Sequence, residues 1–303
     1  MDNKEKYRQF CEAEGARIPL FQQWWWWETV CVGKRWDVLL AERDGRVAGA
    51  MPVLLGRKAC LRYSLMPQLT MFTGPWLADA SDREAFDDLF RQLAERRFVL
   101  YVGRLSPAVS AAGHALPRGY RPSLHYTYRF DPIRPLPELM AAASPLRRRD
   151  YKRLGAMLAV DTAVAAEEFA DFHTAYMQGR GRRDLLPHGL MVRVCSESVR
   201  RGHGLVVGAR DAGGSLQAAL FVACDAECAY MLMLARGPEA PRNAMAFLVW
   251  RTVELMGARV RVFDFEGSME PGVEEFYRSF GPRRVDMTQV RRVGLPFNNA
   301  YGH

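Results

Sequence analysis

Residues 241–284 decide the fold, and they read PRNAMAFLVWRTVELMGARVRVFDFEGSMEPGVEEFYRSFGPRR. In the first part of this stretch, mostly apolar side chains recur at i, i+3, i+4, i+7, i+8 and i+11. This spacing predicts a helix with one apolar stripe, with Asn243 suited to its N-cap and Gly257 to its C′ position. The stripe consists of Met245, Leu248, Val249, Thr252, Val253 and Met256.

A strand, a turn and a second helix are expected after this helix. The run from Val260 to Phe265 has the length and composition of a short buried strand. Asp264 and Glu266 lie two residues apart at its end, so they share one face. The turn GSMEPG follows, and Pro271 suits the first position of a helix. That helix carries a second stripe, which consists of Val273, Phe276, Tyr277 and Phe280.

The segments FDFEGS and GVEEFYRSFG resemble the C-terminal signature of the GNAT acyltransferase superfamily, in particular its FemAB-like and "acetyltransferase 6" types. In that signature a strand and an F-x-G-like turn precede a helix that carries aromatic residues and a final glycine. The resemblance implies an α/β (α+β) fold of tandem GNAT-like domains with mixed sheets flanked by helices. The residues that match are Phe265, Gly267, Phe276, Arg278, Phe280 and Gly281.

An internal repeat points to the same organisation. VLLAERDGRVAGA at 38–50 is similar to VVGARDAGGSLQAA at 206–219, and each reads as a strand, a tight polar turn and a second strand. A helix and a strand follow in both halves, at 81–97 and 98–103 and again at 243–257 and 260–265. In the first of these helices, Ser81 and Glu84 suggest a capping box.

The prolines of FDPIRPLPEL suggest a boundary between a degenerate GNAT-like domain at 1–135 and a GNAT-like domain at 136–303. Two helices, near 166–178 and 187–201, are expected early in the second domain. The resemblance further implies that the C-terminal tail returns to the first domain.

Composition limits the class of protein. The chain has 303 residues, of which 49% are hydrophobic and 25% charged, so it can build a large core. Its net charge of +8 fits an anionic partner, although a solvated basic surface explains the charge equally well. The charged N-terminus is unlike a signal peptide, and no apolar run approaches the ~20 residues of a membrane helix. Scattered cysteines without a metal-ligand spacing favour free thiols in the cytoplasm.

The acyl donor is expected at the start of the helix after residue 243. According to the resemblance, GNAT proteins bind the pyrophosphate of their cofactor on backbone amides there, usually through R/Q-x-x-G-x-G/A. The corresponding segment ARGPEAPRNAMA lacks the paired glycines, which leaves acyl-CoA, an aminoacyl-tRNA or an acyl carrier protein open as donor. An ordinary capped helix is the alternative. The candidate donor-binding residues are Arg236, Arg242, Asn243 and Ala244.

Acyl transfer to an amine requires a base, and Glu266 and Asp264 are the catalytic candidates. Alternatively, Asp264 pairs with an arginine and Glu266 caps the turn. Tyr230 and Ser268 are candidate substrate contacts and proton donors. In the basic run LRRRDYKRL, Arg147, Arg148 and Lys152 are candidates for binding phosphate groups of a substrate or an RNA donor, unless this helix is merely solvated. No metal site is expected.

Four consecutive tryptophans, Trp24 to Trp27, point around the whole circumference of a helix, so we expect that they cannot all enter one core. Some of them are therefore expected to face a neighbouring domain, a ligand or a membrane surface, and packing at the domain junction is the interpretation that we favour.

These observations predict a cytoplasmic N-acyltransferase that acts on an amine of a cell-envelope precursor or a small molecule. Two alternatives stay open: a GNAT-like ligand-binding protein without activity, motivated by the missing glycines, and a nucleic-acid-binding protein, motivated by the charge.

Overall fold

A computed structural model describes residues 2–182, 186–267 and 271–294. The contacts divide the chain into two units. Unit 1 comprises Met1–Tyr126 and the chain from Val285 onward, and unit 2 comprises Thr127–Arg284. The chain thus passes from unit 1 to unit 2 within β7 (Arg121–Phe130) and back within β13 (Arg283–Val293). The first passage precedes the proline-rich segment in which the sequence suggested a boundary.

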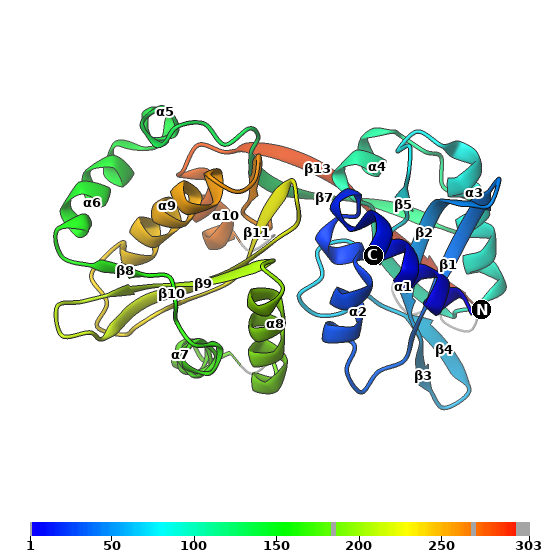
Figure 1. The fold of residues 1–303 in the computed structure, drawn as a ribbon, viewed down its shortest axis with the longest axis horizontal. Coiled ribbons are helices and arrows are strands. Elements are labelled where there is room, and N and C mark those ends of the chain that lie inside the picture. The colour runs from blue at the N-terminus through cyan, green and yellow to red at the C-terminus, as the bar shows by residue number, and fades with distance from the viewer. Residues whose placement is uncertain (1, 183–185, 268–270, 295–303) are drawn as a thin grey trace. The chain divides into compact units, whose positions relative to one another are not determined.

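Unit 1 is built from two sheets and the helices that cover them. One sheet has the order β1-β2-β5, and the strands of the other follow the order β3-β4-β6-β13-β7. Helix α3 packs on β1 and β2 (Figure 1), and Phe86, Leu89 and Phe90 of α3 are buried in the core between them. The helices and strands of unit 1 are α1 (Asn3–Glu14), α2 (Trp24–Val30), β1 (Trp36–Arg43), β2 (Arg46–Leu54), β3 (Gly56–Lys58), β4 (Leu61–Ser64), β5 (Trp76–Leu77), α3 (Arg83–Glu95), β6 (Leu100–Arg104) and α4 (Pro107–Ala111), with short 3₁₀ turns at Gly15–Arg17 and Leu20–Gln22.

Unit 2 is built around one mixed sheet with the order β7-β12-β11-β10-β9-β8. The strands β8 to β11 form an antiparallel meander, β12 runs parallel to β11, and β7 runs antiparallel to β12. The elements are α5 (Leu136–Ala142), α6 (Pro145–Gly155), β8 (Ala159–Asp161), α7 (Ala166–Gly179), α8 (His188–Arg200), β9 (Gly204–Arg210), β10 (Leu216–Cys224), β11 (Cys228–Arg236), α9 (Ala244–Gly257), β12 (Val262–Asp264) and α10 (Pro271–Arg278).

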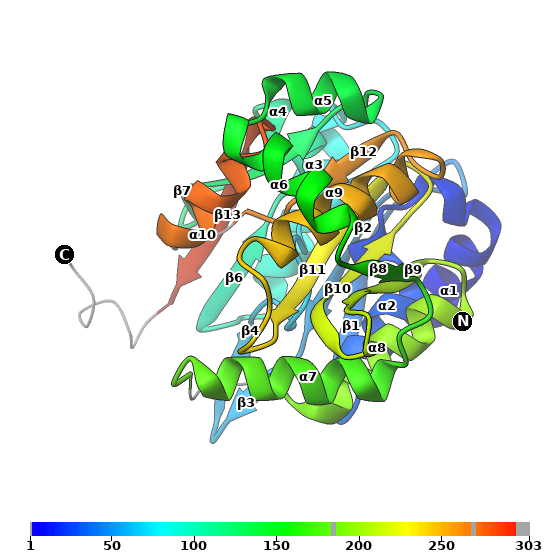
Figure 2. The same cartoon turned by 90° about the vertical axis from the view of Figure 1, so that its left-hand side faces the viewer.

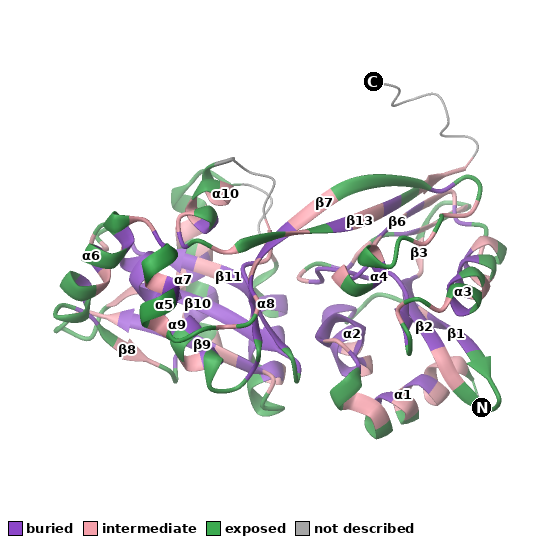
Figure 3. Cartoon of the chain, turned by 90° about the horizontal axis from the view of Figure 1, so that it is seen from above, coloured by how far each residue is buried: buried purple, intermediate pink, exposed green. Residues whose placement is uncertain are grey.

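Helices cover both faces of the sheet in unit 2. Helix α9 lies on one face of β9–β12, and α7 lies on the other face of β10 and β11 (Figures 1 and 2). Because both faces are covered, β10 and β11 are buried along most of their length (Figure 3). The predicted stripe of α9 is buried throughout, and Phe247 and Trp250 on its other sides are buried as well, since α5 and α6 pack there.

The predicted repeat of strand pair, helix and strand is present in the structure. The hairpin β1–β2 is followed by α3 and β6, and the hairpin β9–β10 is followed by α9 and β12. The N-cap of α3 lies one residue after the predicted Ser81. The N-cap is Asp82, whose carboxylate accepts a hydrogen bond from the backbone N–H of Ala85, so there is no capping box at Ser81.

Three of the four tryptophans are buried, and the position at the domain junction stays a prediction. Trp25, Trp26 and Trp27 are all buried, and Trp24 is partly buried. The indole N–H groups of two of them have partners within unit 1: Trp26 donates to Thr70 Oγ1 at 3.1 Å and Trp27 to the carbonyl of Phe21 at 2.9 Å. A short helix whose neighbours lie on several sides can therefore bury successive tryptophans, because each indole finds its own aromatic or polar partner.

No helix among the described residues is long and apolar enough to cross a membrane.

Candidate functional site

Strands β11 and β12 separate part of the way along unit 2. Their parallel pairing covers Cys228–Val262, Ala229–Phe263 and Tyr230–Asp264, whereas β11 continues to Arg236. On its other side β11 stays paired with β10, but Leu232 has no partner there, because Met231 pairs with Val222 and Met233 with Phe221. A β-bulge of this kind takes backbone groups out of the ladder. Beyond Tyr230, β11 therefore continues past the end of its pairing with β12.

The N-terminus of α9 lacks the side-chain cap that the sequence suggested. Asn243 occupies the N-cap position in a left-handed conformation, with φ of 68°, and its side chain makes no capping hydrogen bond. Its amide is engaged elsewhere: Oδ1 accepts from Arg147 Nη1 at 3.1 Å, and Nδ2 donates to Asp150 Oδ2 at 2.5 Å. The N–H of Ala244 donates to the carbonyl of Pro241 at 3.0 Å, and no side chain caps the N–H groups that follow it, an arrangement that suits a bound anion.

Helix α6 holds this N-terminus in place. The guanidinium of Arg147 lies over the rings of Phe276 and Phe280, at 5.1 and 5.3 Å from their centroids, and its Nε donates to Ser279 Oγ at 2.9 Å. Burial lowers the pKa of Arg147, and the nearby Asp150 acts in the opposite direction. The buried Arg147 thus connects α6, the start of α9 and the end of α10.

The other basic candidates differ in their environment. Arg148 is exposed and donates to the carbonyls of Met140, Ala141 and Ala143 at the end of α5. Lys152, Arg236 and Arg242 are exposed, and the Arg242 carbonyl accepts a hydrogen bond from Arg153 at 3.2 Å. Ala244 is buried in the first turn of α9. Arg147, Arg242, Asn243 and Ala244 therefore meet at the start of α9, whereas Arg148 caps a neighbouring helix.

Asp264 at the end of β12 is fully buried and pairs with an arginine. Its Oδ2 lies 2.6 Å from Arg129 Nε, and its Oδ1 accepts hydrogen bonds from the hydroxyl of Thr127 and from the backbone N–H of Glu266, the latter at 2.7 Å. Burial would lower the pKa of the Arg129 guanidinium, but the charge and hydrogen bond of Asp264, together with Cys228 and Tyr230, outweigh that effect and the pKa is raised. The pairing with an arginine matches the structural alternative that the sequence left open for Asp264.

Glu266 follows in a strained backbone conformation and is only partly buried. Its φ of 53° places it in the left-handed region, where the hydrogen bond to Asp264 and one from Gly267 N–H to Thr127 Oγ1 at 2.9 Å fix the turn. Burial raises the pKa of the Tyr277 hydroxyl, and the negative charge of Glu266 raises it further. Glu266 is thus a carboxylate held close to α10. Ser268 lies outside the described residues.

Tyr230 lies beside this turn, because it pairs with Asp264 in the β11–β12 register. Its hydroxyl donates to Asp225 Oδ2 at 3.2 Å. Burial raises the pKa of Tyr230 well above its ordinary value, and the charge of Asp225 adds to that effect. Burial likewise raises the pKa of the Cys228 thiol. Both groups therefore stay protonated at neutral pH, and Tyr230 remains a hydrogen-bond donor.

Sequence reasoning missed several polar residues of this region. Thr127 and Arg129 lie two residues apart on β7, so the strand pattern could have placed them on one face. Their partner Asp264 could not be found in this way, because it lies far away in sequence. Asp150 lies one helical turn from Arg147, and Tyr128 donates to Glu274 Oε1 at 2.7 Å. Among the described residues, no three His, Cys, Asp or Glu side chains gather as they would around a metal ion. All six cysteines are free.

Comparison with known proteins gives a family match for most of unit 2. Residues 146–278 match the family model described as an acetyltransferase (GNAT) domain, which confirms the resemblance drawn from FDFEGS and GVEEFYRSFG. No curated protein matches the chain in sequence.

Solved structures of similar fold extend the likeness to almost the whole chain. The crystal structure of FemX superposes with a TM-score of 0.68 at 12% identity and covers 94% of this chain and 95% of that one. The C-terminal domain of a putative lysylphosphatidylglycerol synthetase from Agrobacterium fabrum gives 0.61 at 14% identity, covering 96% and 93%. L-PGS from Bacillus licheniformis gives 0.60 at 12% identity, covering 96% and 91%. The predicted tandem GNAT-like α/β fold is thereby confirmed.

Proposed function

We propose, from the match of residues 146–278 to the acetyltransferase (GNAT) domain model, that the protein transfers an acyl group from an activated donor to the amine of an acceptor. In this reaction the amine nitrogen bonds to the donor's carbonyl carbon, the bond to the donor's leaving group breaks, and the amine loses a proton. The protein must bind the donor, accept that proton and stabilise charge on the carbonyl oxygen.

The uncapped N-terminus of α9 carries the proposal. A helix N-terminus attracts anions through its free N–H groups and its dipole, and here the only adjacent capping residue, Asn243, is bonded to Arg147 and Asp150 instead. The phosphates of acyl-CoA, of an acyl carrier protein's prosthetic group or of an aminoacyl-tRNA all suit this position. The exposed Arg242 and Arg236 at the two ends of the preceding loop add positive charge.

Three features near the end of β12 suit the chemical step. The partly buried Glu266 is the carboxylate we assign as the base, and the buried pair of Asp264 and Arg129 holds its turn. The β-bulge at Leu232 frees backbone groups of β11 where the strands part, and we assign these as hydrogen-bond donors to the carbonyl oxygen. Tyr230, which stays protonated, is assigned as a proton donor to the leaving group.

For the acceptor we propose an amine on a cell-envelope precursor or on a small molecule. The chain shares its fold with a protein named as a putative lysylphosphatidylglycerol synthetase. That name describes a product in which a lysyl group is attached to a lipid, and this supports an envelope acceptor. Arg148 and Lys152, exposed on α6, are the assigned contacts to acceptor or donor phosphates.

The direct experiment measures donor binding and turnover with acyl-CoAs, acylated carrier proteins and aminoacyl-tRNAs, in the wild type and in Arg242→Gln. We expect Arg242→Gln to weaken donor binding about tenfold, since hydrogen bonds to charged groups contribute about 1.5–3 kcal/mol, while thermal unfolding is unchanged. Arg193→Gln, on the exposed side of α8, removes the same charge elsewhere in unit 2 and should have no effect.

The outcomes separate the alternatives. Donor binding without turnover would indicate a ligand-binding protein of this fold. Salt-dependent RNA binding that Arg242→Gln and Arg193→Gln weaken equally would indicate a diffuse nucleic-acid surface instead.

A further inference from the structure

A pocket in unit 1 gathers arginines. It has a volume of about 310 Å³ and lies among α3, the segment 117–120 and the end of β13. Arg83 and Arg91 of α3, Arg118 of the segment and Arg292 of β13 line it, and Asp87 is its only lining carboxylate among the described residues. The positive side chains therefore come from three separate elements and converge on one recess.

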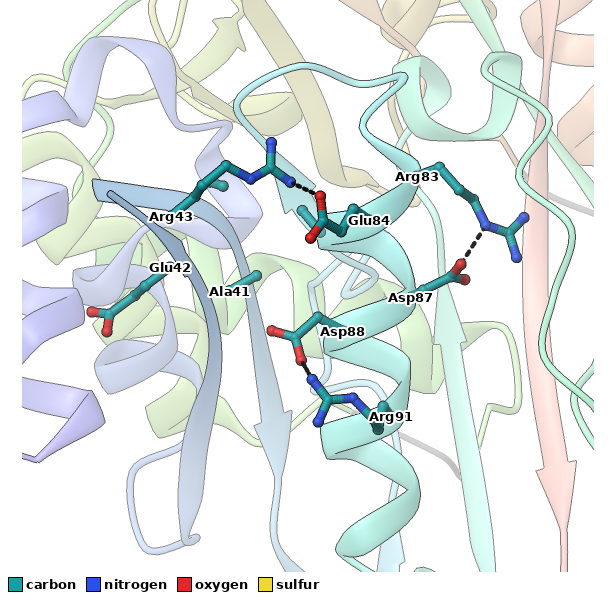
Figure 4. A pocket seen from close by; sticks show the side chains of 10 residues that line it. Ala41, Glu42, Arg43, Arg83, Glu84, Asp87, Asp88 and Arg91 are labelled. Carbon is teal, nitrogen blue, oxygen red and sulfur yellow. Dashed lines mark hydrogen bonds and ion pairs between the residues drawn. The ribbon is translucent and has the colours of Figure 1, made fainter. Parts of the chain in front are cut away.

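Two of these four arginines have no acidic partner. Arg83 Nε lies 2.7 Å from Asp87 Oδ2, and Arg91 pairs with Asp88. Arg118 and Arg292 form no ion pair with any described residue. A neighbouring groove on α3 is different: Figure 4 shows Arg43, Arg83 and Arg91 each bonded to a carboxylate. Of these two recesses, the pocket near Arg118 and Arg292 thus keeps positive charge that no described carboxylate compensates.

The pocket has a rigid aromatic floor. Tyr120 is buried, and Phe90 meets its ring edge-on with centroids 5.1 Å apart. The guanidinium of Arg292 lies over the Tyr120 ring, 5.4 Å from its centroid, and Nη1 donates to the Tyr120 hydroxyl at 3.5 Å. Arg292 is therefore held in one orientation before any ligand arrives, which reduces the entropy lost on binding.

We propose that this pocket binds the phosphate group of a small diphosphate-type ligand, with Arg118 and Arg292 as its principal contacts. Guanidinium groups form paired hydrogen bonds with phosphate oxygens, and an aromatic ring behind a guanidinium fixes the plane of that fork. A volume of about 310 Å³ is at the lower end of small-molecule pockets. A single-stranded nucleic acid would instead follow a groove of basic and aromatic residues along its backbone.

This site is independent of the proposed acyl transfer, because all its residues belong to unit 1 and the donor contacts assigned above belong to unit 2. A phosphate ligand here would be either part of an acceptor or an effector. The two proposals can therefore fail separately.

The test is calorimetric titration of the full chain with inorganic pyrophosphate, followed by UDP. We expect Arg118→Gln and Arg292→Gln each to weaken pyrophosphate binding about tenfold or more, as loss of a charge-assisted hydrogen bond does. Because Arg118 is exposed on a loop, its replacement leaves the fold intact even if that of Arg292 does not. Arg46→Gln, an exposed residue at the start of β2, is the control for the lost charge.

A second control addresses the start of α9, which also suits phosphates. Arg242→Gln should leave unchanged the part of pyrophosphate binding that Arg118→Gln removes. If only Arg242→Gln weakens pyrophosphate binding, or if the wild type binds none, the pocket is not a phosphate site. Tighter binding of UDP than of pyrophosphate would identify a nucleotide-linked ligand, and equal binding would identify the phosphates alone. Binding to phosphatidylglycerol vesicles without binding of pyrophosphate would overturn the proposal in favour of a membrane surface.

Discussion

The two carboxylates at the end of β12 have different surroundings, so their replacement should have different effects. Asp264 is fully buried against Arg129, and Asp264→Asn would leave that guanidinium without its partner. We expect a loss of about 3–5 kcal/mol in the free energy of unfolding. Glu266 is partly buried, and Glu266→Gln should change stability by less than about 0.5 kcal/mol. Its effect should be on turnover, which we expect to fall about 10²–10⁴-fold if Glu266 is the base.

Thermal unfolding and donor turnover, measured side by side on both variants, test this assignment. Thr127→Val is a useful comparison, because it keeps the ion pair and removes only the hydroxyl that donates to Asp264 and accepts from the Gly267 N–H. If Glu266→Gln unfolds the protein as readily as Asp264→Asn does, then Glu266 is a structural group and another base must be sought.

At the scale of elements, the C-terminal end of α10 anchors the turn that precedes it. Phe280 is fully buried, with ring centroids 5.0 Å from Trp250 and 5.5 Å from Phe265, whereas Phe276 is only partly buried. We expect Phe280→Ala to cost about 3–5 kcal/mol of unfolding free energy, as core phenylalanine truncations do. Phe276→Ala, one turn earlier, should cost clearly less. Chemical denaturation of both variants measures the difference, and equal costs would contradict the packing described for α10.

The sequence predicted the elements well wherever a local pattern determines them. The stripe of α9, the strands β1 and β9 and the helices α7 and α8 all lie where periodicity and turn residues indicated. Such patterns suffice because an amphipathic helix or a hairpin is specified by residues that are near one another in the chain.

The polar contacts of the candidate site could not be predicted in the same way. Asn243 is a good N-cap residue by type, but its side chain bonds to Arg147 and Asp150 on another helix. Asp264 finds Arg129 across two strands, and Trp25 to Trp27 are buried because several segments surround α2. These outcomes depend on tertiary neighbours, and a single sequence gives no measure of which residues become neighbours.

At the scale of the whole molecule, the two units repeat one order of elements but differ in how the helix after the strand pair begins. The helix after the strand pair is capped by Asp82 in unit 1, whereas the corresponding helix in unit 2 has no side-chain cap. A capped N-terminus has one of its free N–H groups already satisfied and presents a carboxylate to an approaching anion. The donor site that we propose therefore belongs to α9 and not to α3.

Hydrogen exchange of the full chain, with and without donor, tests this asymmetry. The amide of Ala244 is bonded to the Pro241 carbonyl, but no side chain caps those of Met245 and Ala246, so we expect these two to exchange faster in the free protein and to slow by about ten- to a hundredfold when a donor saturates the site. The first amides of α3 serve as the internal control, because Asp82 already caps that helix and a donor would be repelled by its carboxylate. Protection limited to peptides from residues 237–250 would support the assignment. Protection at 82–95 instead would move the donor site to unit 1, and it would show that a cap seen in the free protein does not prevent an anion from binding.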